Sequence, residues 1–239
     1  MSRKIHLSVR MRMILEMLQP TPRLLDVGCD HGYLSVAAVE RNIASTAVAI
    51  DVRSKPLEKA TNLISKCNLQ HLITTDLSDG LNNIELSRQD AIIIAGMGGI
   101  EIGEILRRTD LAERNKIGQV ILHPTRSAYE LRKVLQELHL DIVDERLCRE
   151  KEKIYVIIKA VPVESNPNPS ARLSEAELFF GPCLWQALQT QLKSEQTLDT
   201  LMFGYLNNRL TALNNLNYNT DYRQRCGLIR LELEGLYNR

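Results

Sequence analysis

The sequence lacks any cysteine spacing that is typical of a zinc site or a disulfide framework. Its cysteines are scattered and none are spaced as C-x-x-C: Cys29, Cys67, Cys148, Cys183 and Cys226. An odd number without a pattern indicates reduced thiols, as in a cytoplasmic protein. We therefore expect a cytoplasmic chain without a bound metal.

Long apolar runs and an excess of one charge are also missing. No run is long enough to span a membrane, and the first 18 residues carry charges through their apolar positions, so we expect neither a membrane partner nor a signal peptide. The 30 Lys and Arg nearly cancel the 29 Asp and Glu, leaving a net charge of +1. Near-neutrality weakens the case for a nucleic-acid partner without excluding it, because many nucleic-acid enzymes are basic only locally.

Apolar runs and amphipathic segments do alternate, up to about residue 160. The apolar runs predict strands at residues 23–27, 46–51, 72–75, 90–95 and 119–122. The amphipathic segments predict helices at residues 7–18, 33–41, 100–111 and 128–138, and another that Ser54 caps. Residues 141–147 and 153–160 flank the charged turn CREKEK and predict a hairpin. Repeated βα units closed by such a hairpin predict an α/β fold, a doubly wound sheet with an antiparallel edge.

The rest of the chain predicts a separate helical part. We expect one domain over residues 1–161, a linker rich in proline and asparagine over 162–172, and a helical hairpin over 173–239. A first long helix, broken at Gly181-Pro182, would carry an apolar stripe from Leu184 to Leu206. A second helix after residues 214–221 would carry Leu228, Leu231 and Leu236, which together suggest a coiled-coil-like pair. We expect a monomer.

The stretch LLDVGCDHGYLS contains the first predicted turn between a strand and a helix, and its residues indicate which ligand this turn binds. A dinucleotide-binding oxidoreductase needs glycines at positions 30 and 33, where this chain has Asp30 and Tyr33. A carboxylate also opposes a pyrophosphate. The methyltransferase pattern acid-x-G-x-G-x-G fits as Asp26, Gly28, Asp30 and Gly32, broken only in the middle. Its ligand, S-adenosylmethionine (SAM), carries a sulfonium and an ammonium, beside which a carboxylate is favourable.

Further acids and glycines follow the next predicted strands, where open α/β sheets bind ligands. Asp51 suits a ribose hydroxyl, and Asp79 suits an adenine amine. Each aspartate alone could equally be a cap or turn residue; their occurrence in order at successive strand ends favours a methyltransferase. The predicted SAM contacts are Asp26, Gly28, Cys29, Asp30, Gly32, Asp51, Val52, Asp79, Gly80, Gly96, Met97 and Gly98.

The loop after the fourth strand restricts the acceptor atom. It reads AGMGG (residues 95–99) and lacks the Asn/Asp-Pro-Pro-aromatic sequence that methyltransferases of amino groups often carry there. It also holds no cysteine that could attack a pyrimidine carbon. A ring nitrogen with an in-plane lone pair needs mainly alignment with the methyl group, so this loop favours ring-nitrogen chemistry.

Five stretches together resemble one family: LSVRM, LLDVGCDHGYL, IIIAGMGG, ILHPT and EKIYVIIKA are similar to the bacterial tRNA adenine-22 N1-methyltransferases. The resemblance covers roughly residues 7–160 and continues more weakly through GPCLW into the tail, where that family has a coiled-coil-like domain. It implies SAM as methyl donor and N1 of adenine 22 in tRNA as acceptor. The chain departs from the family at His123-Pro124-Thr125, where Gln-Pro-Asn is expected, and at Cys29 and Gly32, where serine and alanine are common.

The resemblance leads to expected roles. Asp26, Asp30 and His31 are the candidate catalytic residues, and an extruded adenine would enter beside them. The candidate substrate-binding residues are Arg10, Tyr33, Gly99, His123, Pro124, Thr125 and Arg126. Two basic groups could track tRNA phosphates: Arg3, Lys4, His6, Arg10 and Arg12; and Arg107, Arg108, Arg114 and Lys116. Two alternatives stay open, a SAM-dependent methyltransferase of another substrate and a catalytically inactive RNA-binding protein of the same fold.

Overall fold

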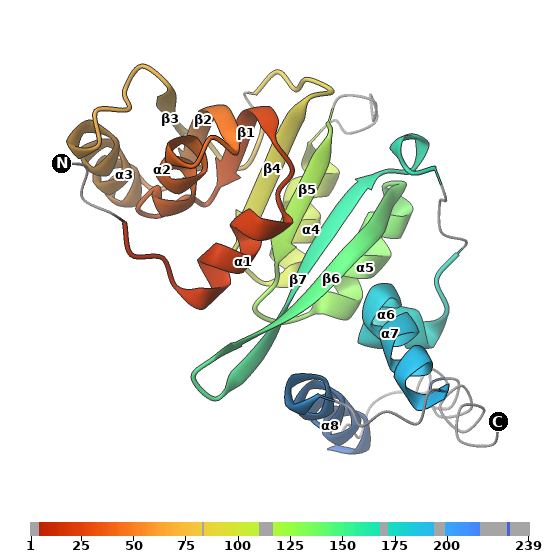
Figure 1. Cartoon of the computed structure of the whole chain (residues 1–239). Coiled ribbons are helices and arrows are strands. Elements are labelled where there is room, and N and C mark those ends of the chain that lie inside the picture. The colour runs from red at the N-terminus through yellow and green to blue at the C-terminus, as the bar shows by residue number, and fades with distance from the viewer. Residues whose placement is uncertain are drawn as a thin grey trace.

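A seven-stranded sheet in the order β3-β2-β1-β4-β5-β7-β6 forms the centre of the computed structural model (Figure 1). The structure describes residues 5–82, 84–109, 117–167, 172–193, 199–215 and 229. The strands are β1 (Thr21–Val27), β2 (Ala44–Asp51), β3 (Ile73–Leu77), β4 (Asp90–Ala95), β5 (Gln119–His123), β6 (Leu140–Glu150) and β7 (Lys153–Pro162). The first five run parallel, and β7 is antiparallel to both of its neighbours. The predicted doubly wound sheet with an antiparallel edge is therefore confirmed.

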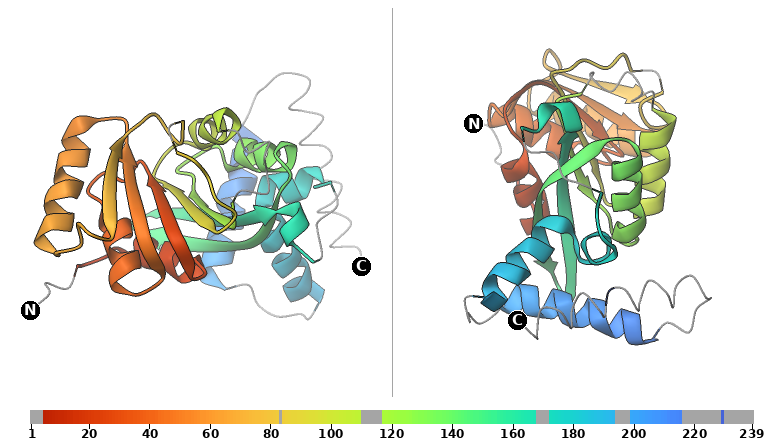
Figure 2. Two further views of the ribbon diagram at one scale, coloured as in Figure 1. Left: turned by 90° about the horizontal axis from the view of Figure 1, so that it is seen from above. Right: turned by 90° about the vertical axis from the view of Figure 1, so that its right-hand side faces the viewer.

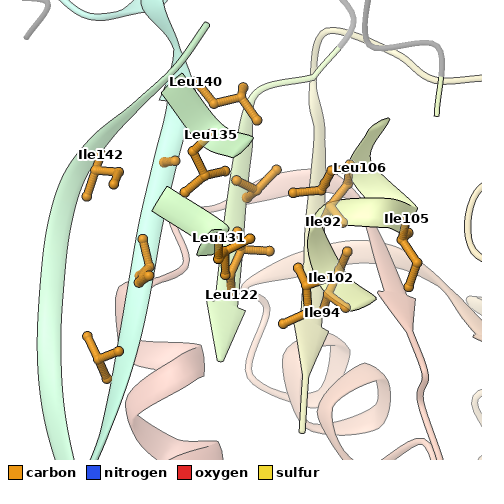
Figure 3. Close-up of a cluster of buried hydrophobic side chains, with 14 of the residues drawn as sticks. Ile92, Ile94, Ile102, Ile105, Leu106, Leu122, Leu131, Leu135, Leu140 and Ile142 are labelled. Atoms are coloured by element: carbon orange, nitrogen blue, oxygen red, sulfur yellow. The ribbon is translucent and has the colours of Figure 1, made fainter. Parts of the chain in front are cut away.

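Helices cover both faces of the sheet (Figure 2). One face carries α1 (Val9–Met17), α2 (Tyr33–Glu40) and α3 (Ser54–Lys66), and the other carries α4 (Gly99–Arg108) and α5 (Ala128–Glu137). Successive residues of β4 point to opposite faces, so Ile92 and Ile94 pack with α4 and α5 (Figure 3), whereas Ile93 packs with α1 and α2. Burial on both faces explains why DAIIIA is almost entirely apolar. No described helix is long and apolar enough to cross a membrane.

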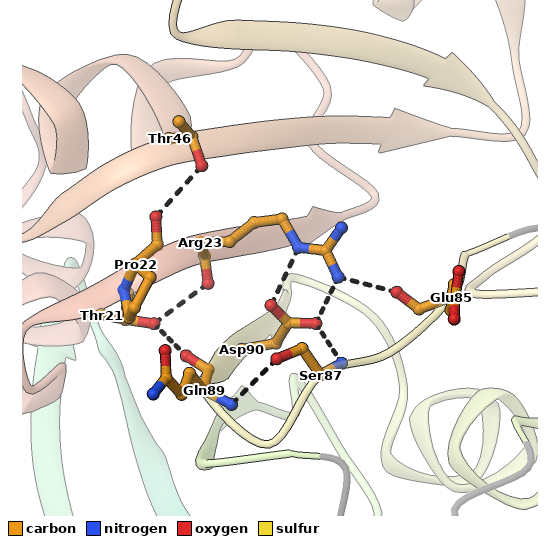
Figure 4. A network of polar contacts seen from close by, with 8 residues as sticks. All are labelled: Thr21, Pro22, Arg23, Thr46, Glu85, Ser87, Gln89 and Asp90. Carbon is orange, nitrogen blue, oxygen red and sulfur yellow. Dashed lines mark hydrogen bonds and ion pairs between the residues drawn. The ribbon is translucent and has the colours of Figure 1, made fainter.

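A polar network ties β1 to β4 at their amino ends (Figure 4). The Arg23 guanidinium donates to both carboxylate oxygens of Asp90, at 2.8 and 2.5 Å, and to the carbonyl of Glu85. Asp90 also accepts from the Ser87 amide, and the Thr21 hydroxyl donates to the Gln89 carbonyl. Hydrogen-bonded side chains thus occupy the amino ends of β1 and β4. A binding site is therefore expected at the opposite edge of the sheet, where the parallel strands have their carboxyl ends.

The β6–β7 hairpin is longer than the sequence predicted. Cys148 to Glu150 continue β6, so the turn is only Lys151 and Glu152. In β5, only Val120, Ile121 and Leu122 pair with β7, and the hairpin therefore extends beyond the sheet at its carboxyl edge. The start of the predicted linker also differs: Pro162 ends β7 and a 3-10 turn, η2 (Val163–Ser165), follows it.

The carboxyl-terminal part contains α6 (Glu175–Phe180), α7 (Pro182–Lys193) and α8 (Thr200–Asn215). The predicted break at Gly181 is confirmed, and its φ of 106° explains why glycine stands there. The single long helix beyond it was a wrong prediction, because Asp199 caps a new helix by accepting hydrogen bonds from the Leu201 and Met202 amides. The predicted second helix, with Leu228, Leu231 and Leu236, lies outside the described residues.

The predicted cap of α3 was also wrong. Ser54 is the first residue of the helix, and Arg53 is the cap residue, without a side-chain capping bond. The Asp51 carboxylate instead accepts a hydrogen bond from the Arg53 amide at 3.0 Å, just before the helix begins. The polar residue that orders this turn therefore belongs to the end of β2.

Candidate active site

A cavity of about 810 Å³ opens at the carboxyl ends of β1, β2, β3 and β4, and α1 forms one of its walls. Its volume is in the range of small-molecule sites. The structure brings together most of the predicted site residues around it: Arg10, Asp26, Gly28, Cys29, Asp30, Tyr33, Asp51, Val52, Asp79, Gly80, Gly96, Met97, Gly98, Thr125 and Arg126. The strand ends predicted from the sequence therefore converge on one site.

The other predicted residues stand behind or beside the cavity wall: His31, Gly32, Gly99, His123 and Pro124. The His31 ring lies against two lining residues, with its Nδ1 2.6 Å from the Asp30 carboxylate and its ring stacked on Tyr33 at 5.7 Å between centroids. Gly32 directly precedes α2 with a φ of 70°, and a Cβ there would lie 3.0 Å from that of Ala60. Gly32 thus serves the turn and the packing of α2 on α3.

Asp26 lies in the floor of the cavity, with only 2% of its surface exposed. It accepts hydrogen bonds from the amide and the hydroxyl of Ser35, at 3.2 and 2.7 Å. Burial raises the pKa of Asp26 to about 6, because the two Ser35 bonds offset only part of the desolvation. Ser35 on α2 is a partner that the turn motif did not predict.

Asp51 provides the second buried carboxylate, 3% exposed, at the end of β2. One oxygen accepts from the Asp30 amide at 3.3 Å, and the other from the Arg53 amide. Asp51 is close enough to raise the pKa of Asp26 electrostatically. Two neighbouring carboxylates make the floor negative, which suits a cationic ligand and opposes a phosphate.

The loop after β4 is fastened to the loop after β5. The Gly96 amide donates to the His123 carbonyl at 3.1 Å and to its Nδ1 at 3.3 Å. The Met97 carbonyl accepts from both the amide and the hydroxyl of Thr125, at 2.8 and 3.1 Å. These hydrogen bonds hold the backbone of the AGMGG loop in one conformation where it lines the cavity.

Glycines in these loops allow close approaches. A Cβ at Gly99 would lie 2.2 Å from the carbonyl oxygen of Ser127, and one at Gly28 would lie 2.1 Å from the methyl carbon of Met97. The Met97 side chain therefore lies directly against the first glycine turn. A glycine at each position lets the ends of β1, β4 and β5 pack into one cradle.

His123 is fully buried, so its ring stands behind the cavity wall, whereas the sequence predicted contact with the target base. Burial, and to a smaller extent the nearby Arg10, lower the pKa of His123 to about 4, which keeps the ring neutral near pH 7. The ring packs on Tyr155 at 5.2 Å between centroids. Through the Gly96 amide, His123 holds the loop that lines the cavity.

Motif reasoning missed other residues that line the cavity: Met11, Ile14, Leu34, Arg53, Ser78, Glu101 and Ile105. The spacing of Met11 and Ile14 contributed only to the prediction of a helix at residues 7–18, and it does not indicate that this helix lies beside the carboxyl ends of the strands. Arg10 on the same helix pairs with Glu150 of the hairpin at 3.3 Å. The amino-terminal helix is thus part of the site.

The predicted basic groups are partly neutralised. Arg107 pairs with Glu137 at 2.6 Å, and Arg108 pairs with Asp79 at 2.7 Å. The Arg12 guanidinium donates to the Leu7 carbonyl at 2.9 Å, and His6 is exposed before α1. The remaining members, Arg3, Lys4, Arg114 and Lys116, lie outside the described residues.

Comparison with known proteins agrees with this geometry. Residues 7–158 match the family model described as a methyltransferase domain. The tRNA (adenine(22)-N(1))-methyltransferase of Bacillus subtilis is 30% identical over 184 residues, which cover 76% of each chain. The chain belongs to this methyltransferase family. The seven-stranded sheet is its Rossmann-like methyltransferase fold with antiparallel edge strands.

Two solved structures of this fold contain the cofactor or its product. TrmK of M. capricolum, in complex with S-adenosyl-homocysteine, is 26% identical, with a TM-score of 0.71 and coverage of 95% of this chain and 98% of that one. Sp1610 of Streptococcus pneumoniae, in complex with S-adenosyl-L-methionine, is 27% identical, with a TM-score of 0.70 and coverage of 86% and 99%. Together with the family match, these complexes support S-adenosylmethionine as the cofactor of this chain.

Proposed function

We propose that the protein transfers a methyl group from S-adenosylmethionine to N1 of adenine 22 in tRNA. The observation that carries the proposal is the pair of buried carboxylates, Asp26 and Asp51, in the floor of one cavity beside the Gly28 turn. The relative from Bacillus subtilis, named for this reaction, supports the same substrate.

The residues of the cavity fit S-adenosylmethionine. Asp51, at the end of β2, would hold the ribose hydroxyls. Asp26 and the Gly28 turn would hold the cationic methionine end, because a buried carboxylate favours an ammonium or sulfonium. When bound, the cofactor supplies an electrophilic methyl group on sulfur. The further residues proposed to contact it are the predicted ones that line the cavity: Cys29, Val52, Asp79, Gly80, Gly96, Met97 and Gly98.

The exposed rim of the cavity would receive the target base. N1 lies on the Watson–Crick edge of adenine, so the base must leave its stack to reach the cavity. Asp30, 61% exposed and paired with His31, would face the base and stabilise the positive charge that N1-methylation creates. Tyr33 would stack on the base, while Thr125 and Arg126 would border it. The more deeply buried Asp26 then serves the cofactor, with Asp30 and His31 on the acceptor side.

Two substitutions separate these roles. We expect Asp26→Ala to abolish detectable binding of S-adenosylmethionine by calorimetry. Asp30→Ala should keep cofactor affinity within a few-fold and lower methyl transfer from labelled cofactor to unmodified bulk tRNA by at least tenfold, within the range of electrostatic stabilisation. Glu164→Ala, an exposed residue of η2, is the control. If both variants bind the cofactor and methylate normally, neither carboxylate has the proposed role.

The remaining features are proposed on the same basis. Residues 173–239 would form a helical, coiled-coil-like part beyond a linker at 162–172, since α6, α7 and α8 already make its described portion helical. Arg10 and Arg126 would contact tRNA phosphates at the rim. The protein would act as a metal-free monomer in the cytoplasm, where tRNA is modified.

A further inference from the structure

The two carboxylate oxygens of Asp26 differ in their surroundings. Oδ2 accepts both hydrogen bonds from Ser35, one from the amide at 3.2 Å and one from the hydroxyl at 2.7 Å. Oδ1 has no hydrogen-bond partner among the residues that the structure describes, but it is not one of the fully buried side-chain atoms that lack a partner, so it retains accessible surface. Because Asp26 lines the cavity, Oδ1 is the oxygen that a ligand can reach.

Ser35 reaches Oδ2 from the first turn of α2. It is the third residue of this helix and is fully buried. The amides of a first turn have no partner within their own helix, and Gly32, the residue before α2, has no side chain that could accept from them. Asp26 therefore caps α2 from β1, and its negative charge suits this end of the helix. The amide bond alone provides this cap, so the hydroxyl adds a second, shorter bond to the same oxygen.

The groups around Asp26 offer its charge little other support. Burial raises the pKa of Asp26 to about 6, and the Ser35 hydroxyl opposes this rise more strongly than the Ser35 amide. Asp51 of β2 adds a second negative charge, and the residues of β4 beside Asp26 are isoleucines. Cys29 of the turn stays a neutral thiol near pH 7, because burial raises its pKa. Arg10 of α1 lines the cavity but pairs with the β6–β7 hairpin.

We propose that Ser35 is a positioning residue for cofactor binding, because its hydroxyl keeps the Asp26 carboxylate ionised with Oδ1 towards the cavity. This rests on the proposed function, in which the carboxylate holds the cationic end of S-adenosylmethionine. Ser35 is fully buried and does not line the cavity, so it acts only through Asp26. Without the hydroxyl, the amide bond still caps α2, whereas the charge on Asp26 is less stabilised.

Calorimetry with S-adenosylmethionine between pH 5.5 and 8.5 tests the proposal. Ser35→Ala should move the pH profile of the affinity upwards by about one pH unit, because a lost hydrogen bond to a charged group raises the pKa of Asp26. The variant should therefore bind about fivefold more weakly than wild type at pH 6 and within about twofold of wild type at pH 8.5. Ser35→Thr keeps the hydroxyl and should keep the wild-type profile. Ser35→Cys, a weaker donor of similar size, replaces Ser35→Ala if that variant does not fold.

Thr21→Val is the matched control, since it removes a buried hydroxyl of β1 that donates to the Gln89 carbonyl, away from the cavity. It should lower the melting temperature but keep the wild-type pH profile. If Ser35→Ala follows wild type at every pH, or binds more weakly by the same factor at every pH, the hydroxyl does not control Asp26 and the proposal is wrong. Failure of the wild-type protein to bind S-adenosylmethionine at any pH would instead contradict the proposed function itself.

Discussion

Asp26 is an ionisable residue that is almost completely buried. Its raised pKa shows that burying the ionised carboxylate lowers the stability of the folded protein. The pKa of about 6 in the folded protein lies above the ordinary value of 3.8. The folded state therefore binds a proton more tightly than the unfolded state, and stability falls as the pH rises from about 4 to about 6. Above pH 6 the charged carboxylate remains buried, which is unfavourable without a cationic ligand.

Replacing Asp26 with asparagine should stabilise the unliganded protein near pH 7.5. The amide oxygen can still accept from Ser35, but no charge is buried, so we expect a gain on the order of 2–3 kcal/mol in the free energy of unfolding. The gain should shrink towards zero at pH 4, as urea titrations at both pH values will measure. A variant that is less stable than wild type at pH 7.5 would contradict the buried charge.

Cofactor affinity should also depend on the protonation of Asp26. Since the ionised carboxylate attracts the cationic ligand, affinity for S-adenosylmethionine should decrease as the pH falls from 7 to 5, with the decline setting in near the pKa of about 6. His123→Gln should keep this profile, because His123 has a pKa of about 4 and stays neutral throughout. A flat wild-type profile measured by calorimetry would contradict the role of Asp26.

Single residues differ in how far the sequence predicts them. Asp26, Gly28 and Asp51 were predictable because acids and glycines at successive strand ends converge in any parallel sheet. The isolated pattern could not indicate that His123 is buried behind the wall, or that the Ser78 hydroxyl has no hydrogen-bond partner among the residues that the structure describes. Both facts depend on how loops from different strands pack, which sequence spacing does not encode.

The turn after β4 depends on backbone packing against the turn after β5. Gly99→Ala should destabilise the protein by about 2 kcal/mol or more, because its Cβ would lie 2.2 Å from a carbonyl oxygen that cannot rotate away. Gly96→Ala should cost only about 1–2 kcal/mol, since its φ of 86° is unfavourable for alanine but the space is open. Denaturant unfolding that ranks Gly96→Ala as the more damaging variant would contradict this packing.

Elements were most predictable where burial is uniform. The predicted bounds of β4 match the observed ones, because polar residues on both sides of an apolar run mark where the buried strand begins and ends. The hairpin was predicted too short, since Cys148 to Glu150 look polar but pair with Lys153 to Tyr155. The division between α7 and α8 was missed because an apolar stripe persists across it, whereas the Asp199 cap is a local feature.

In the whole molecule, a buried ion pair joins the carboxyl-terminal helices to the sheet. The Arg132 and Glu145 side chains are both fully buried, at 2.9 Å. Arg132 also donates to carbonyls at the end of α6, including that of Leu178, and Glu145 accepts from the Cys183 amide at the start of α7. Each charge thus lies at the helix end that its sign favours. The described helical part is fixed to α5 and β6.

Replacing only one partner of the Arg132–Glu145 pair should lower the free energy of unfolding more than replacing both partners. Arg132→Met leaves a buried carboxylate uncompensated and should cost about 3–5 kcal/mol. Arg132→Met combined with Glu145→Leu should recover at least about 1 kcal/mol of this loss, because no buried charge remains. Arg107→Met, at an exposed pair, should cost less than about 1 kcal/mol. The pairing would be contradicted if denaturant titrations showed that the double variant loses as much stability as the single substitutions Arg132→Met and Glu145→Leu lose together.

The central claim, methylation of N1 of adenine 22, is tested most directly by mapping the product on a tRNA transcript. The protein and S-adenosylmethionine are incubated with an unmodified transcript and with one that has guanine at position 22, and primer extension follows. Because N1-methylation blocks Watson–Crick pairing, we predict a reverse-transcription stop at position 22 of the first transcript and no methyl incorporation into the second. Equal methylation of both transcripts, or incorporation without a stop at position 22, would contradict the account.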